Sequence, residues 1–371
     1  MKSSNKIINL EILRVIGCIT IVWFHLCKSV LLKIFPDCHL YTRLGIMSCN
    51  GMKAVDLFFI LSGFFFAYKL NLHKTLFEFV EHKVKRLWPV LIFVIVTSYI
   101  VHIFGGIDWN LWDNLLILLG LNGTSLVLPA KTHTAAGPFW YVSAMLWVLS
   151  FIFYIRKILP KKFTDLIIAM CVFFSYSFIL HSKQGAINSM HQTFYYIFNV
   201  GLMRAMGGCG IGYFIGEWFK NWNNNEHTNK LSVYFYSIVE FACLYFIIND
   251  LMFYKNNYQN QIIFIIVFVL CIVLFLQKRG FVSQFLNNSK FAIWVSKAGV
   301  YTYSIYMTHF FVIKMFTKSF YLWYRDWILL HPVLMLIFTM FVILMFGILT
   351  YYLVEKPVAD YFRYKKALEK V

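Results

Sequence analysis

The stretch EILRVIGCITIVWFH, residues 11–25, is almost entirely apolar between Ile12 and Phe24, yet it contains Arg14 and ends at His25. A charged side chain in the middle of a bilayer costs at least about 2.5 kcal/mol. An α-helix turns about 100° per residue, so the eleven steps from Arg14 to His25 leave an offset of about 20°. At a rise of about 1.5 Å per residue, the two side chains are roughly 16 Å apart along the axis. The stretch therefore predicts a membrane helix with one polar face.

The composition extends this interpretation to the whole chain. Of 371 residues, 60% are hydrophobic, 20% aromatic and 13% charged, whereas about 25% of the residues in soluble domains are charged. Such a chain has too little polar surface to fold in water, so its partner is the lipid bilayer. We therefore interpret the net charge of +18 through the distribution of Lys and Arg between the two sides of the membrane, and we expect no nucleic-acid partner.

Apolar runs long enough to cross a bilayer recur along the chain. They predict an all-α integral membrane protein, a single domain over 1–371, with about ten transmembrane helices. The expected helices cover 9–32, 53–71, 88–105, 138–155, 164–181, 196–219, 231–248, 262–277, 292–316 and 332–354. The sixth is rich in glycine and contains Arg204. Small residues let membrane helices approach closely, so we expect this helix to be buried in the bundle.

The distribution of Lys and Arg predicts the orientation. With the N-terminus inside, the inside segments carry 20 of the 34 Lys and Arg residues, and the outside segments carry eight. Cytoplasmic loops are enriched in these residues. Both termini are therefore predicted to be cytoplasmic, which agrees with an even number of helices.

A second polar stretch is GMKAVDLFFILSGFFF, residues 51–66, with Lys53 and Asp56 at the predicted outer end of its helix. Asp56 is either a structural partner of another charge or an active-site group. Ser62 lies near the middle of the helix and does not belong to a GxSxG nucleophile motif. We interpret it as a small residue where two helices pack.

A third stretch, EHKVKRLWPV at 81–90, places Lys83, Lys85 and Arg86 before the third helix on the cytoplasmic side. The positive-inside rule explains basic residues here without any further role. Alternatively they form a phosphate clamp together with Arg14, because Arg and Lys bind phosphate through charge-assisted hydrogen bonds.

A fourth stretch, YTYSIYMTHFF at 301–311, lies in a helix that runs from inside to outside like the first. His309 is expected at a depth comparable to that of His25, and Tyr303 and Tyr306 add hydroxyl groups. The sequence leaves open whether the two histidines share one task.

Two further groups complete the polar set. Glu355 is expected to end the last helix, which Pro357 stops, at the level of Arg14 and Arg86. Glu11 lies one turn before Arg14 and can partly neutralise it.

Two other features have ordinary explanations. Trp140 and Tyr141 begin the fourth helix at the outer interface, where aromatic belts are usual. Cys38 and Cys49 both fall in the first outside loop, where they either form a disulfide or remain two free thiols. No cysteine and histidine spacing indicates a metal site, so we expect no metal.

Together these stretches resemble the membrane-bound acyltransferase 3 family, over positions 9–357. The first helix has the family's Arg-x10-His spacing at Arg14 and His25, and VDLFFILSGF at 55–64 looks like its second helix. The family's Arg-x-x-Arg motif is replaced here by Lys83-x-x-Arg86, which keeps the charge but weakens bidentate binding at position 83. FWYVSAMLW, YSIYMTH and EKP follow in the family's order.

The resemblance implies transfer of an acyl group, most often acetyl, from cytoplasmic acyl-coenzyme A to a hydroxyl of an extracytoplasmic glycan. It also implies a bacterial inner membrane. Acetyl-coenzyme A, or another acyl-coenzyme A, is then a co-substrate, with no bound cofactor. His25 is assigned as general base or acyl carrier. The remaining assignments are donor binding by Arg14, Lys83 and Arg86, and supporting roles for Glu11, Asp56, Tyr306, His309 and Glu355.

The main alternative is a transporter or exporter of a lipid-linked saccharide. Ten helices, a glycine-rich helix and buried charges also fit that class, although no second half resembles the first. A receptor-like or structural membrane protein explains the polar face of the first helix poorly. The sequence identifies neither the acceptor nor the acyl group.

Overall fold

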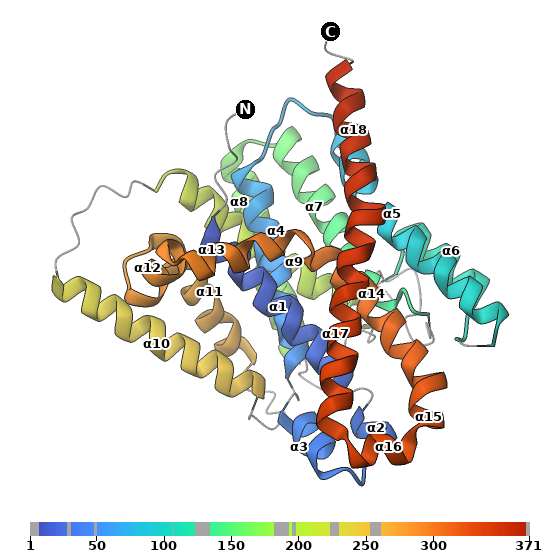
Figure 1. Cartoon of the computed structure of the whole chain (residues 1–371). Helices are drawn as coiled ribbons and strands as arrows, with labels where there is room; N and C mark the ends of the chain where they lie inside the picture. Colours follow the sequence, from blue (N-terminus) through green and yellow to red (C-terminus); the bar gives the residue numbers. More distant parts are fainter. Residues whose placement is uncertain are drawn as a thin grey trace.

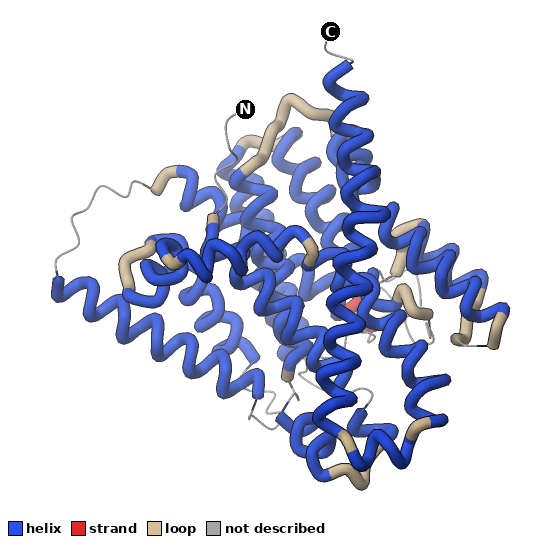
Figure 2. The backbone as a smooth tube through the Cα atoms, viewed as in Figure 1, coloured by secondary structure: helices blue, strands red, loops and turns tan. Residues whose placement is uncertain are grey.

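The computed structural model describes residues 7–27, 31–47, 50–105, 107–122, 134–181, 193–194, 198–222, 230–252 and 261–368. The chain is a bundle of helices (Figures 1 and 2). Within these ranges, seven helices are long and apolar enough to cross a membrane, or up to eight if the bent pair Ile262–Gln277 and Phe281–Asn288 is one span. The chain is therefore a multi-pass membrane protein, and the predicted count of ten spans is not confirmed.

Every predicted range contains a helix. The α-helices are α1 (Ile8–Leu26), α2 (Leu32–Ile34), α3 (His39–Met47), α4 (Ala54–Tyr68), α5 (Leu76–Ile103), α6 (Leu111–Leu118), α7 (Trp140–Ile158), α8 (Lys161–His181), α9 (Val200–Lys220), α10 (Lys230–Met252), α11 (Gln261–Gln277), α12 (Phe281–Asn288), α13 (Lys290–Lys297), α14 (Thr302–Met315), α15 (Tyr321–Trp323), α16 (Arg325–Leu330), α17 (Pro332–Thr350) and α18 (Lys356–Leu368). Two π-helical segments are η7 (Phe316–Phe320) and η8 (Tyr351–Glu355), and 3-10 turns are η2 (Gly51–Lys53), η4 (Gly137–Phe139) and η6 (Ala298–Val300). Strands β1 (Thr193–Phe194) and β2 (Phe198–Asn199) pair antiparallel.

The two ends of the described chain lie toward the same end of the bundle. In Figure 1, α1 begins toward the top and α18 ends there, whereas α2, α3 and α16 lie at the bottom. This arrangement agrees with an even number of crossings. The assignment of the upper end to the cytoplasm stays a prediction.

The helices differ in how much of their surface faces outward. On α8 and α10, large apolar side chains are well exposed, such as Phe173 at 68% and Tyr245 at 74%. Hydrocarbon is the environment in which such surfaces are stable. In contrast, the glycines of α9 are buried, which confirms that this helix lies inside the bundle.

The contact between α4 and α9 is made backbone to backbone. A Cβ atom on Gly63 would lie 2.0 Å from the Cys209 carbonyl oxygen, and one on Gly212 would lie 2.0 Å from the Ile60 carbonyl oxygen. Such distances exclude any side chain at either position. Glycine therefore sets the spacing of these two helices, as small residues do in membrane bundles.

The third helix begins earlier than predicted. Thr75 caps α5 by accepting from the backbone N–H of Glu78, whose carboxylate in turn accepts from the backbone N–H of Thr75. This capping box starts a helix of 28 residues. Lys83 and Arg86 consequently lie on α5 itself, on one face three residues apart, and not in a segment before the helix.

Two other boundaries also differ from the prediction. The ninth predicted helix, 292–316, is interrupted by η6, and α14, which follows it, has 14 residues. At this interruption a Cβ atom on Gly299 would meet the Glu11 carboxylate. The last helix does not stop at Pro357, because α17, the π-helical η8 and α18 follow one another without a gap, and Pro332–Lys365 is one span of 34 residues. The π-helical segment directly before Pro357 is where this span departs from the α-helical hydrogen-bond pattern.

Replacing Gly212 with alanine tests the contact between α4 and α9. We expect Gly212→Ala to lower the thermal unfolding midpoint of the detergent-solubilised protein, because overpacking costs about 1–3 kcal/mol or more. The matched control is Gly137→Ala, where the nearest neighbouring atom would be 4.0 Å away. Equal midpoints for the two variants would contradict this packing.

Candidate active site

Two histidines meet in the interior. The Nδ1 atom of His25, on α1, lies 3.1 Å from the Nε2 atom of His309, on α14, and the two ring centroids are 5.0 Å apart. His309 is fully buried and His25 is half-buried. The pair joins two residues that are 284 positions apart in sequence, so the two histidines form one site.

The backbone neighbours of this pair determine the tautomers of the neutral rings. His309 Nδ1 lies against the Tyr306 carbonyl oxygen, and His25 Nδ1 lies 3.1 Å from the Ile21 carbonyl oxygen. A carbonyl oxygen can only accept, so both Nδ1 atoms carry hydrogen. His309 Nε2 is then an acceptor for His25 Nδ1–H. His25 Nε2 consequently holds a free lone pair, and no described residue donates to it.

At the other end of the same helical face, Arg14 donates to Glu11 at 3.1 Å and to the Thr302 hydroxyl at 3.4 Å. Glu11, Arg14 and His25 all keep partial exposure. The lipid-facing side chains of α1, such as Ile16 at 53% and Ile19 at 43%, lie on the other side of the helix. The polar face is therefore turned away from these isoleucines and keeps partial exposure.

Basic residues of α5 lie near this end of α1. Arg86 interacts electrostatically with Arg14 and Glu355, and Lys83 interacts with Arg86. Glu355 is buried and accepts a hydrogen bond from Ser304. We call Arg14, Lys83 and Arg86 the basic group. It brings together positive charges from α1 and α5, as the phosphate-clamp hypothesis requires.

The third basic residue of that stretch does not join the basic group. Lys85 forms an ion pair with Glu81 at 2.6 Å, with both side chains about 40% exposed, and its ammonium lies 5.0 Å from the Phe362 ring.

Asp56 has a structural partner elsewhere. It accepts two hydrogen bonds from Arg204 of α9, at 3.0 and 3.2 Å, and both side chains are fully buried. Arg204 also donates to the Met52 carbonyl oxygen. Lys53 instead pairs with Asp250 of α10 at 2.6 Å. Intramembrane charges pair with one another, but the sequence does not show which charges meet.

The aromatic residues of the fourth helix are not interfacial. Trp140 is 7% exposed and lies 5.7 Å from the Arg204 guanidinium, and Tyr141 is 9% exposed. The interpretation of these two residues as belt aromatics is therefore wrong. They pack against α4 and α9, so they belong to the core. Tyr306 is also buried, and its hydroxyl donates to the Pro138 carbonyl oxygen at 3.0 Å.

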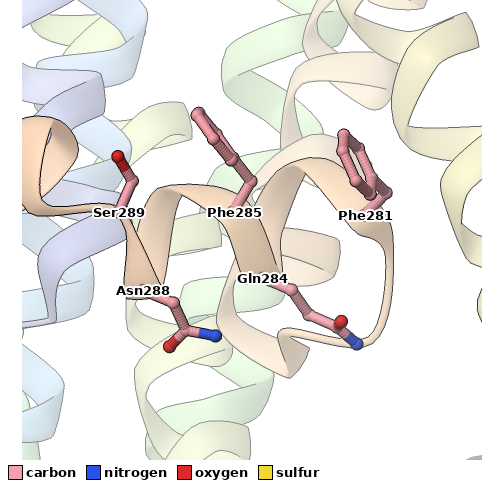
Figure 3. Close-up of a pocket in the computed structure, with 5 residues that line it drawn as sticks. All are labelled: Phe281, Gln284, Phe285, Asn288 and Ser289. Carbon is pink, nitrogen blue, oxygen red and sulfur yellow. The ribbon is translucent and has the colours of Figure 1, made fainter.

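Cys49 falls outside the described residues, so its pairing with Cys38 stays untested. A surface pocket on α12 is lined by five residues, none of which belongs to the histidine pair or the basic group: Phe281, Gln284, Phe285, Asn288 and Ser289 (Figure 3).

The sequence model of a family described as an acyltransferase domain, acyltransferase 3, matches residues 7–352. The chain belongs to the acyltransferase 3 family. Searches of curated proteins and of solved structures found no match. The matched range holds both histidines and the whole basic group, and it ends just before Glu355. Membership identifies the chain as an acyltransferase.

A substitution of Asp56 tests whether its ion pair with Arg204 stabilises the fold of this member of the acyltransferase 3 family. We expect Asp56→Asn to destabilise the protein by about 3–5 kcal/mol, because it leaves a buried arginine without its counter-ion. The fraction of monodisperse protein and its thermal midpoint in detergent measure this effect.

Arg14→Gln is the matched control, because the Arg14 side chain is 23% exposed and we expect it to keep the wild-type midpoint. A fully stable but inactive Asp56→Asn protein would instead place Asp56 in the catalytic machinery.

Proposed function

We propose that this acyltransferase transfers an acyl group, most commonly acetyl, from cytoplasmic acyl-coenzyme A to a hydroxyl of an extracytoplasmic glycan. The acceptor is a surface polysaccharide or a lipid-linked sugar, and the membrane is the inner membrane of a bacterium. One observation carries the proposal. Arg14 of the basic group and His25 of the histidine pair lie on one partly exposed face of α1, roughly 16 Å apart along the helix axis.

The basic group is suited to the phosphates of the donor. Arg14 and Arg86 offer planar guanidinium groups that bind phosphate oxygens in pairs, and Lys83 adds a point charge. Glu11 and Glu355 balance part of this charge when no donor is bound. The donor's phosphates would then remain near the cytoplasmic side while its thioester reaches toward His25.

His25 would act through the lone pair on Nε2. As general base, it takes the proton of the acceptor hydroxyl while the hydroxyl oxygen attacks the thioester carbonyl carbon. The C–S bond then breaks, and the coenzyme A thiolate receives the proton from the imidazolium. As acyl carrier, Nε2 itself attacks the thioester carbonyl carbon, and the C–S bond breaks to release the coenzyme A thiolate. The acyl group then passes from Nε2 to the hydroxyl oxygen, and the hydroxyl proton goes to the thiolate. Both routes need the same unprotonated nitrogen.

His309 is a positioning residue in this scheme. Its Nε2 accepts from His25 Nδ1–H, which holds the proton on Nδ1 and keeps Nε2 of His25 free. When His25 becomes positively charged during the reaction, this hydrogen bond becomes charge-assisted and stronger.

Purified protein in proteoliposomes, supplied with labelled acetyl-coenzyme A and a glycan acceptor, tests the proposed reaction. We expect coenzyme A release that depends on the acceptor and label that moves to the glycan. We expect His25→Ala to lower turnover by about 10²–10⁴-fold, the usual contribution of a general base. Wild-type turnover by a folded His25→Ala protein would contradict the mechanism. Saccharide movement without coenzyme A release would favour the transporter alternative.

Variants of His309 test the positioning role. We expect His309→Gln to keep more activity than His309→Phe, because the glutamine amide oxygen can replace Nε2 as acceptor and phenylalanine cannot. The measurement is kcat for each variant at saturating donor, with chromatographic profiles as the folding control. Equal losses in both variants would show that the acceptor atom of His309 has no role.

A further inference from the structure

Ser62 and Tyr141 form a hydroxyl pair between α4 and α7. Their oxygens are 2.9 Å apart, and the Tyr141 hydroxyl also lies 3.1 Å from the Phe58 carbonyl oxygen. Either hydroxyl can donate to the other, and Tyr141 can also donate to the Phe58 carbonyl oxygen or to the Met145 sulfur, 3.6 Å away. A hydroxyl oxygen has two lone pairs, so the Ser62 oxygen keeps at least one that no described residue uses.

Ser62 does not serve the packing of α4 against α9. The neighbouring residue, Gly63, makes the close approach to α9, whereas Ser62 points toward α7 and is half-buried. Ser62 therefore lies where α4 packs against α7, in agreement with its interpretation as a small residue between two helices. An alanine would fill the same space, so the hydroxyl group itself needs an explanation.

Ser62 belongs to an accessible face of α4. Phe58, Ser62 and Phe65 are half-buried and Lys69 is exposed, while their neighbours on the helix are mostly buried. These four positions lie within about 60° of one another around the helix. The face spans eleven steps, as does the face between Arg14 and His25 on α1. Like that face, it keeps partial exposure.

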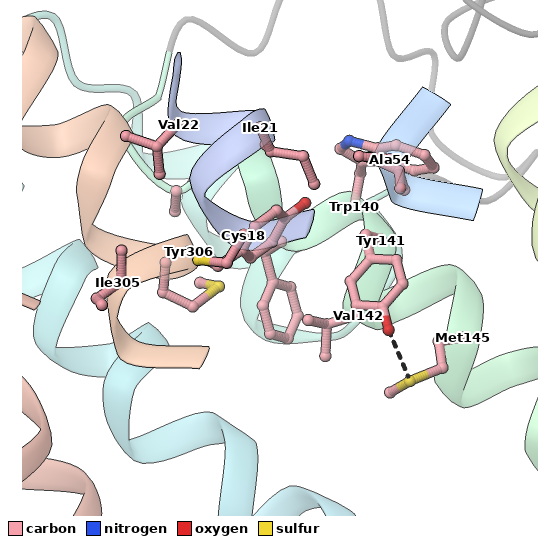
Figure 4. Packing of buried hydrophobic residues seen from close by; sticks show 14 of the residues in the cluster. Cys18, Ile21, Val22, Ala54, Trp140, Tyr141, Val142, Met145, Ile305 and Tyr306 are labelled. Carbon is pink, nitrogen blue, oxygen red and sulfur yellow. Dashed lines mark hydrogen bonds between the residues drawn. The ribbon is translucent and has the colours of Figure 1, made fainter. Parts of the chain in front are cut away.

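Aromatic rings link the hydroxyl pair to the histidine pair. Phe58, Tyr141 and Tyr306 form a ring triangle with centroids 5.8 to 6.2 Å apart, and Tyr306 is 5.7 Å from the His309 ring. Figure 4 shows Tyr141 and Tyr306 gathered with Cys18, which lies one turn beyond Arg14 on α1. This region is apolar except for hydroxyl and thiol groups.

We propose that Ser62 and Tyr141, with the rings of Phe58 and Tyr306, form the subsite for the pantetheine arm of the donor. The inference rests on the proposed function. The arm is uncharged and extended, and it carries two amides, so it suits an apolar passage with one free acceptor. An amide N–H of the arm donates to the Ser62 oxygen, while the rings contact its methyl and methylene groups.

Two donors separate this subsite from the basic group. Acetyl-coenzyme A carries both the nucleotide phosphates and the arm, whereas S-acetylpantetheine carries the arm alone. We expect Ser62→Ala to raise KM for both donors by about twofold to tenfold, the worth of one hydrogen bond. We expect Arg86→Gln to raise KM far more for acetyl-coenzyme A than for S-acetylpantetheine.

The matched control is Ser98→Ala, which removes a buried hydroxyl that donates to the Val94 carbonyl oxygen of its own helix, α5. We expect wild-type KM values for both donors from this variant. Tyr141→Phe is the second test variant and removes the partner of Ser62, so we expect the same pattern from it as from Ser62→Ala. Chromatographic profiles show whether each variant is folded.

The outcomes distinguish the subsite from the proposed function. If the wild-type protein turns over neither donor, the proposed function fails and the subsite fails with it. If the wild-type protein is active but Ser62→Ala and Tyr141→Phe keep wild-type KM values, the subsite is wrong and the function stands. A rise for acetyl-coenzyme A alone would also overturn the subsite, because it would place these hydroxyls beside the nucleotide.

Discussion

Hydrocarbon offers no hydrogen bonds, and this constraint determines how the polar helices of the bundle are rotated. On α1 it turns Arg14 and His25 inward, away from the lipid-facing isoleucines. On α4 and α9 it brings Asp56 and Arg204 together as a fully buried ion pair. Each polar residue of a membrane helix must therefore find its partner in the bundle, and the resulting contacts decide which faces of the helices meet.

The close contact of α4 with α9 has a second consequence. Glycines at this contact let the two backbones touch, so one side of α4 is fully occupied by α9. The opposite region of α4, which carries Phe58 and Ser62, is left to face α1, α7 and α14. A helix that is fixed tightly on one side can thus present an accessible, ordered face on another. The rigid contact supports the site without contributing a group to the chemistry.

The proposed donor site has three parts. Positive charges of α1 and α5 form the first, the hydroxyl pair with its aromatic rings forms the second, and the histidine pair forms the third. These parts match the groups of an acyl-coenzyme A, whose phosphates, amide-bearing arm and thioester need charge, neutral contacts and a base, respectively. The match supports a donor that remains extended while its acyl group reaches the acceptor.

The sequence by itself determined the membrane class, the positions of the helices and the shared face of Arg14 and His25, because hydropathy and helical periodicity are local properties. Motif order also led to the family. Only the tertiary structure decided that His309 meets His25, that Asp56 pairs with Arg204, and that Ser62 faces Tyr141. These contacts join residues on different helices, and their choice depends on how each helix rotates and packs, which no local pattern contains.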